Sequence, residues 1–320
     1  KSAGETPMKI PLCAIVICAW LSAALVVAGP FEPTAVPQGS SWVAHIDFDR
    51  LRTTEIGKRL IAGTSRGQAA ARMQVIQNLF QMDPRTDFHS MTLSGHGQGE
   101  ENAVLVLRAD FDRAALTALL EAGPAYQEVP HHNWTLYRFQ DERKQKMAWG
   151  AFLDDRTIVC GQSQERVGEC LETLAGARPA AADALWAAVP DRGALFAATA
   201  DLAHMGELDA QAAILRQAES LALSVDESDG LLKVRVALSA DSPEVATQLN
   251  QVAQGLIAMG SLAAAKDPAK AWVPGFCQGI RVTQDGRSVQ VSADYPVKDA
   301  VELIDAREKA RGLEGTMGTK

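Results

Sequence analysis

The sequence has few cysteines, few aromatic residues and fewer basic than acidic residues, and each shortage excludes a class of protein. The 320 residues include only five cysteines, so the chain is not a disulfide-built scaffold. Lysine and arginine total 31 against 39 acidic residues, which gives a net charge of −8. This balance argues against a nucleic-acid partner, because binding phosphates requires a basic surface. Aromatic residues make up 6% of the chain, fewer than a carbohydrate cleft normally uses.

Motifs of common catalytic and cofactor chemistry are also missing. The chain has no Ser-x-x-Lys pair in a convincing place for a nucleophile. A glycine-rich loop, SGHGQGEE at residues 94–101, precedes an expected strand, whereas a phosphate-binding loop precedes a helix. His131 and His132 are adjacent, and adjacent side chains of an extended chain point apart, so we expect that the pair does not chelate as a unit. The sequence therefore predicts no metal and no cofactor.

Residues 1–28 have the layout of upstream residues followed by a secretory signal peptide. Lys9 follows Met8 and supplies a short positive region, and residues 12–27 form an apolar run without charge. Residues 26–28 (VVA) then offer the small-residue pattern of a signal peptidase site. We therefore expect export to the periplasm or the extracellular space. The alternative is an uncleaved segment, which would be the only expected contact with a membrane.

The rest of the chain is predicted to contain two copies of one plan. Strands and helices follow one another in a similar order twice, at a spacing of about 150 residues that indicates domain duplication. The segment before the first copy is rich in proline, glycine and serine and is predicted to be a linker. The predicted divisions are a linker at 29–41, a first repeat at 42–177, a connector at 178–193, a second repeat at 194–312 and a frayed tail at 313–320.

Strands are expected in hairpins. Asp229-Gly230 and Asp285-Gly286 are strong signals for tight turns between strands. Successive strands joined by turns favour antiparallel sheets. The predicted fold class is α+β, with two similar halves, each a mainly antiparallel sheet with helices packed on one face. Whether the two sheets join is left open.

The first strand of the first repeat carries the candidate binding residues. Residues 42–49 alternate, and we expect Trp42 and its even-numbered companions to face the core. His45, Asp47 and Asp49 would then share the solvent-facing side and could converge on a cation or a water molecule. A solvated strand face, with Asp49 capping the next turn, is the favoured interpretation.

This strand and the segment after it resemble the start of a family of exported bacterial proteins of uncharacterised function. The similarity is confined to a Trp-Val-x-His-x-Asp strand and a Leu-Arg-x-Thr-x-x-Gly segment. The matching residues are Trp42, Val43, His45, Asp47, Leu51, Arg52, Thr54 and Gly57. The resemblance implies export and a repeated α+β body, and it implies no activity.

Three cysteines follow the signal segment. Cys160 ends an expected strand and Cys170 lies on the apolar face of the next expected helix, so the two could form a disulfide in an oxidising compartment. A free, buried pair is the favoured alternative. Acidic residues flank both thiols, a setting that raises a thiol pKa and disfavours a nucleophile.

Together these patterns predict an exported, non-catalytic binding or structural protein of the periplasm or cell envelope. Its partner would be a protein or a small ligand of unknown identity. The alternative is a secreted hydrolase that uses carboxylates in a cleft between the two repeats. Convergent acidic or histidine side chains in such a cleft would favour the hydrolase.

Overall fold

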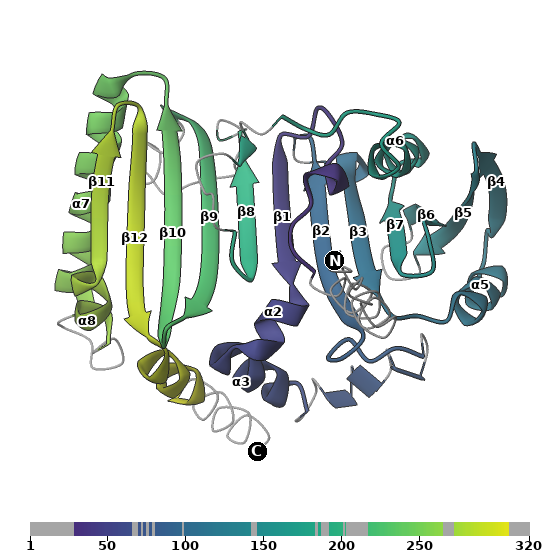
Figure 1. The fold of residues 1–320 in the computed structure, drawn as a ribbon, viewed down its shortest axis with the longest axis horizontal. Coiled ribbons are helices and arrows are strands. Elements are labelled where there is room, and N and C mark those ends of the chain that lie inside the picture. The colour runs from purple at the N-terminus through teal and green to yellow at the C-terminus, as the bar shows by residue number, and fades with distance from the viewer. Residues whose placement is uncertain are drawn as a thin grey trace, which may run out of the picture.

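One sheet organises the structure, and every pair of neighbouring strands in it is antiparallel (Figure 1). The computed structural model describes residues 29–65, 70–71, 73–74, 77–78, 81–97, 99–141, 146–182, 185–186, 192–200, 202, 217–264 and 272–306. The predicted signal segment and the predicted tail at 313–320 lie outside this range. The predicted α+β class is confirmed.

The sheet has 12 strands in the order β11-β12-β10-β9-β8-β1-β2-β3-β7-β6-β5-β4. The strands are β1 (Trp42–Asp47), β2 (Phe88–Gly95), β3 (Ala103–Ala109), β4 (Gln127–His131), β5 (Trp134–Asp141), β6 (Lys146–Phe152), β7 (Thr157–Gly161), β8 (Leu195–Thr199), β9 (Ala218–Ser228), β10 (Leu231–Ala240), β11 (Ile280–Asp285) and β12 (Ser288–Pro296). The two predicted repeats meet where β1 pairs with β8, so they form one continuous sheet. The duplication itself stays a prediction.

Both predicted tight turns are confirmed. Ser228 pairs with Leu231 across Asp229 and Gly230, which have φ angles of 56° and 72°. These left-handed conformations match the twist of a two-residue hairpin turn. In the second hairpin Asp285 pairs with Ser288, so Gly286 and Arg287 make the turn, one residue later than the Asp-Gly pattern placed it.

Four of the described helices begin at a side chain that caps the first turn. The described helices are η1 (Pro33–Ala35), α2 (Phe48–Thr53), α3 (Glu55–Gly63), η2 (Glu100–Asn102), α5 (Arg113–Glu121), α6 (Gln164–Leu174), α7 (Pro243–Ala264) and α8 (Val273–Gln278). The side chains of Asp47, Thr54, Asp112 and Ser163 accept backbone hydrogen bonds in the first turns of α2, α3, α5 and α6. None of the described helices combines the length and the hydropathy that a membrane crossing requires.

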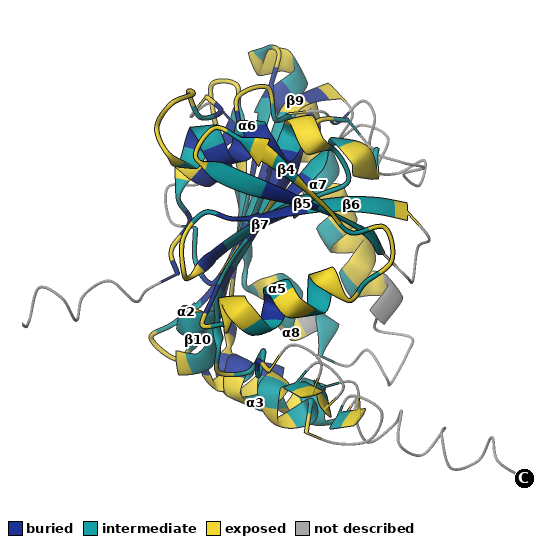
Figure 2. Cartoon of the chain, turned by 90° about the vertical axis from the view of Figure 1, so that its right-hand side faces the viewer, coloured by how far each residue is buried: buried dark blue, intermediate teal, exposed yellow. Residues whose placement is uncertain are grey.

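Helices cover both faces of the sheet, so the expectation of helices on one face was wrong. Leu136 packs in a cluster with α6, whereas the next residue, Tyr137, packs in a cluster with α5. Successive side chains of a strand point to opposite faces, which places α5 and α6 on opposite sides (Figure 2). We call the side with α6 the front face, and the side with α5 and α7 the rear face.

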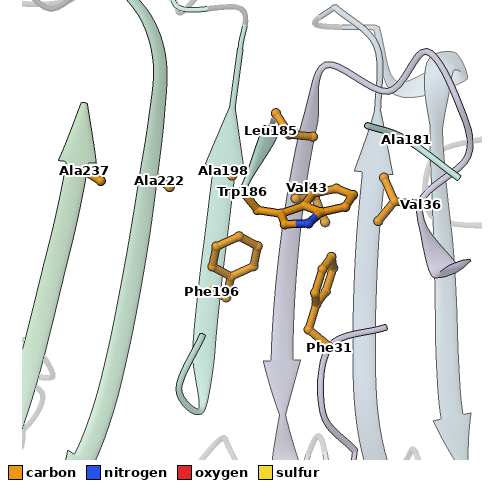
Figure 3. Packing of buried hydrophobic residues seen from close by; sticks show 10 residues of the cluster. All are labelled: Phe31, Val36, Val43, Ala181, Leu185, Trp186, Phe196, Ala198, Ala222 and Ala237. Carbon is orange, nitrogen blue, oxygen red and sulfur yellow. The ribbon is translucent and has the colours of Figure 1, made fainter. Parts of the chain in front are cut away.

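Residues 29–38 belong to the fold, and the prediction of a linker at 29–41 was wrong. Phe31 and Val36 are 9% and 0% exposed, and they pack on the front face with Val43. Trp186, from the predicted connector, is 1% exposed and completes this cluster (Figure 3). The proline and glycine content suggested an exposed segment, but aromatic and aliphatic side chains between the prolines are the groups that bury.

The Phe31 ring lies at the centre of the front cluster. Its centroid is 5.2 Å from the Trp186 ring and 5.3 Å from the Phe196 ring. Edge and tilted contacts of this kind add to the burial of apolar area. Residues 29–38 therefore act as the cover of β1 and β8.

We predict that Phe31→Ala lowers the free energy of unfolding by about 3–5 kcal/mol, because a large buried ring is replaced by a cavity. Urea unfolding followed by tryptophan fluorescence measures this change. Thr34→Ala, at an exposed position of the same segment, is the control and should change stability by no more than about 0.5 kcal/mol. If Phe31→Ala lowered the free energy of unfolding no more than the control does, residues 29–38 would not contribute to the core.

Candidate functional site

The His45 side chain is buried and makes two hydrogen bonds. It is 1% exposed, its Nδ1 lies 2.9 Å from the Thr92 hydroxyl and its Nε2 lies 3.0 Å from the Gly29 carbonyl. Since a carbonyl only accepts, Nε2 carries a proton and the Thr92 hydroxyl donates to Nδ1. Burial lowers the pKa of His45 from 6.5 to about 4, and the bond to Gly29 opposes part of this shift. Both nitrogens are therefore engaged within the fold.

Asp47 and Asp49 turn to different partners. Asp47 is 5% exposed and accepts a hydrogen bond of 2.8 Å from the backbone N–H of Arg50 at the start of α2. Burial raises the pKa of the Asp47 carboxyl. Asp49 pairs with Arg52, and its two oxygens each lie 3.1 Å from Nδ1 of His89. The three candidate residues thus do not converge on a common point.

The prediction of which side chains of β1 face the core was wrong. Along β1 the odd-numbered residues are buried and the even-numbered residues are half-buried. The prediction placed the apolar members Trp42, Ala44 and Ile46 inside. It failed because residues 29–38 cover the front face, to which His45 and Asp47 point. The buried polar atoms of His45 and Asp47 are satisfied by hydrogen bonds to the Gly29 carbonyl and the Arg50 backbone N–H.

Carboxylates from the second predicted repeat meet the first at the end of β1. Asp226 on β9 is 6% exposed and forms an ion pair with Arg50, whose side chain is 42% exposed. The Glu227 carboxylate accepts hydrogen bonds of 2.8 and 3.0 Å from the first two N–H groups of α3. Negative charge at a helix N-terminus is stabilising. These acids join the two parts of the chain and are engaged in structural contacts.

A second polar cluster was missed by sequence reasoning. Nε2 of His131 and Nε2 of His132 lie 3.0 and 3.2 Å from the same oxygen, Oε1 of Glu172 on α6. His132 has a φ of 51° in the turn between β4 and β5, so the backbone there is not extended. The two rings therefore turn to the same side, with centroids 4.7 Å apart. The expectation that the adjacent histidines point apart was wrong.

Cys160 and Cys170 are free thiols in the structure. Cys170 lies on α6 and packs on the front face, whereas Cys160 follows Val159, a front-face residue, and so points to the rear. Burial raises the pKa of Cys160 to about 11 and that of Cys170 to about 12. Neither thiol is poised as a nucleophile.

Comparison with known proteins does not identify a family. No protein-family model matches the chain, and no curated protein matches it. Among solved structures, crystal form III of TP0453 is similar at 8% identity with a TM-score of 0.48, and the match covers 87% of this chain and 98% of that one. Crystal form I of the same protein matches at 9% identity with a TM-score of 0.46, covering 86% of this chain and 97% of that one. At this similarity the match carries no argument about activity.

The burial of His45 predicts a stability that falls as the pH falls. The neutral imidazole is favoured in the folded protein, whereas the unfolded chain binds a proton below pH 6.5. Between pH 7 and pH 5 the unfolded state binds more protons, so we expect a loss of about 2 kcal/mol from this group. Asp47 acts in the opposite direction, because burial raises the pKa of its carboxyl and the folded state then binds more protons as the pH falls. Urea unfolding at both pH values measures the loss.

The control variant is His45→Gln, which cannot be protonated. Its stability should vary less between pH 7 and pH 5 than that of the natural protein, by about the same 2 kcal/mol. An equal pH dependence in the two proteins would contradict the assignment of the loss to His45.

Proposed function

We propose that this chain is an exported, non-catalytic protein of the cell envelope that acts by binding another protein chain. The internal contacts of His45, Asp47 and Asp226 support this proposal, because they engage the side chains that could otherwise do chemistry. The observation that carries the proposal is an apolar surface at one end of the sheet. This surface, which we call the β11 edge, consists of β11 and α7.

Helix α7 exposes apolar side chains without charged neighbours of its own. From Val245 to Ala264 the helix contains no charged residue. Leu256, Met259 and Leu262 on this helix are 37%, 51% and 70% exposed. Exposed apolar side chains that cluster in this way mark binding surfaces more often than scattered ones do. In Figure 1, α7 runs along β11 at the left-hand end of the sheet.

An open groove of about 350 Å³ lies between α7 and the strand beside it. Its lining is mostly apolar and includes Ile257, Ala258, Ser261, Cys277, Ile280 and Val282. Apolar contact area beside a free strand suits a partner that adds a strand to the sheet and packs a second element against α7.

The two end strands of the sheet differ in how open they are. The far end strand, β4, contains Pro130, which lacks the N–H that pairing requires. The strand β11 contains no proline and no lysine, the residues that commonly protect an edge. Strand addition is therefore favoured at β11.

The charges of β11 fit a second copy of the same strand. Its exposed residues are Arg281, Thr283 and Asp285, which share one face. If two copies pair antiparallel about Thr283, Arg281 of each lies opposite Asp285 of the other. This register makes two cross-strand ion pairs and brings the two α7 helices together on the rear face. We infer a homodimer through the β11 edge.

For the purified chain we predict a dimer at micromolar concentration and 0.15 M salt. Arg281→Glu replaces two attractive pairs with two like-charge pairs, so we expect the dissociation constant of the dimer to rise at least about tenfold. The double change Arg281→Glu with Asp285→Arg restores opposite charges and should restore the dimer. Sedimentation velocity measures the distribution of species.

A second pair of variants tests the proposed contact between the two α7 helices of the dimer. Leu262→Glu should also weaken the dimer, whereas Leu60→Glu, at a 46% exposed leucine of α3, should not. A natural protein that stays monomeric at about 100 µM would refute the β11 edge as a self-contact, because the proposal expects a dimer at micromolar concentration. Failure of the double charge swap alone would refute the register.

The export part of the proposal is tested separately in a Gram-negative host. We predict that osmotic shock releases a chain that starts at Gly29, because the apolar run after Lys9 ends in a cleavage pattern. Ile15→Arg with Ile17→Arg interrupts that run and should leave the precursor in the cytosol. N-terminal sequencing of the released chain decides, and a membrane-bound chain that keeps residues 8–28 would contradict cleavage.

A further inference from the structure

We propose that His131, His132 and Glu172 form a binding site for a divalent transition metal of the zinc type. The two imidazole Nε2 atoms lie 3.0 and 3.2 Å from Oε1 of Glu172, and all three atoms lie within 4.8 Å of one another. A tetrahedral zinc ion with bonds of about 2.0–2.1 Å holds its ligand atoms roughly 3.3–3.4 Å apart. Small side-chain movements would therefore bring the three atoms to coordination distance.

The turn between β4 and β5 brings the two histidines together. His131 pairs with Trp134, so His132 and Asn133 alone make the turn. His132 adopts a φ of 51°, a left-handed conformation in which glycine or asparagine is the usual residue. A histidine at this position costs backbone energy that an asparagine would avoid, and such a cost is often retained at functional sites.

Neighbouring residues leave space for the site and orient its carboxylate. A Cβ atom at Gly168 would lie 2.8 Å from both Cε1 and Nε2 of His131, so any side chain there would displace the ring from this position. Arg178 forms an ion pair with Glu172, with Nε 2.8 Å from Oε2, and its Nη1 donates to Oε1 of Glu169 at 2.7 Å. The second oxygen of Glu172 is thus held while Oε1 faces the rings, as in metal sites with an oriented carboxylate.

The ligand set selects among cations. Two imidazoles and one carboxylate suit zinc, copper or nickel, whereas magnesium and calcium prefer oxygen ligands. The charged groups in contact here are Glu169, Glu172, Arg166 and Arg178, which together sum to zero. The affinity would therefore rest on coordination. His132 is 66% exposed, so a fourth position is open to water.

The test is calorimetric titration of the full chain, without a histidine tag, with zinc chloride at pH 7.5. We expect one zinc ion per chain, with micromolar or tighter affinity, and no binding of magnesium. His132→Asn keeps a residue that tolerates the turn, and Glu172→Gln keeps the carboxylate's shape. Each should weaken binding at least about tenfold, since loss even of an outer contact costs 10–100-fold. His96→Asn, at an exposed histidine elsewhere, is the matched control and should bind as the natural chain does.

A variant that leaves the helix intact separates ligation from folding. Gly168→Ala places a methyl group against the His131 ring, while alanine favours the helix. We expect native circular dichroism with zinc binding at least about tenfold weaker, because the ring must move. Absence of saturable binding to the natural chain, or unchanged binding in both His132→Asn and Glu172→Gln, would overturn the proposal.

Discussion

The pairing of β1 with β8 is the contact on which the rest of the structure depends. Trp42 to Ile46 pair with Thr199 to Leu195, and this ladder joins the seven strands from β1 to β4 with the five from β8 to β11. The front face of β1 and β8 carries apolar side chains, including Val43 and Phe196, and burying them away from water is favourable. The cover on the front face is Phe31 and Trp186, from segments that precede and follow the first predicted repeat.

That cover explains the polar residues of β1. His45 can be buried because residues 29–38 bring the Gly29 carbonyl to its Nε2, while Thr92 on the next strand supplies a hydroxyl. A buried imidazole that lacked these partners would be destabilising. The backbone of residues 29–38 and the side chain of His45 therefore depend on each other, and the residue that looked most like a ligand holds the N-terminal segment in place.

Local patterns in the sequence predicted the elements well, because those patterns are local in origin. Alternation identified the strand that begins at Trp42, and Asp229-Gly230 identified a hairpin. The buried face of β1 was not predictable in the same way. Which face of β1 is buried depends on Phe31 and Trp186, which are distant along the chain, and a period of two cannot distinguish a cover from solvent.

The candidate sites show the same limit. Arg50 and Asp226 are 176 residues apart in sequence, so no local spacing could reveal their ion pair. The pair His131-His132 was visible, but its meaning changed with one φ angle. An extended backbone would separate the rings, whereas the left-handed turn at His132 joins them over Glu172. Recognising His132-Asn133 as a two-residue turn between strands would have been the signal for that cluster.

The two ends of the sheet impose different limits on assembly. A sheet with two open end strands can add further chains at both sides and grow without closing. Here β4 carries Pro130, and its turn is tied to α6 through Glu172, whereas β11 is left with a groove and an apolar helix beside it. One usable edge permits a pair of chains related by a twofold axis and no third chain, because pairing consumes the edge. Because strand addition is blocked at β4, an apolar surface at the β11 edge can bind one further chain without the sheet growing into a polymer.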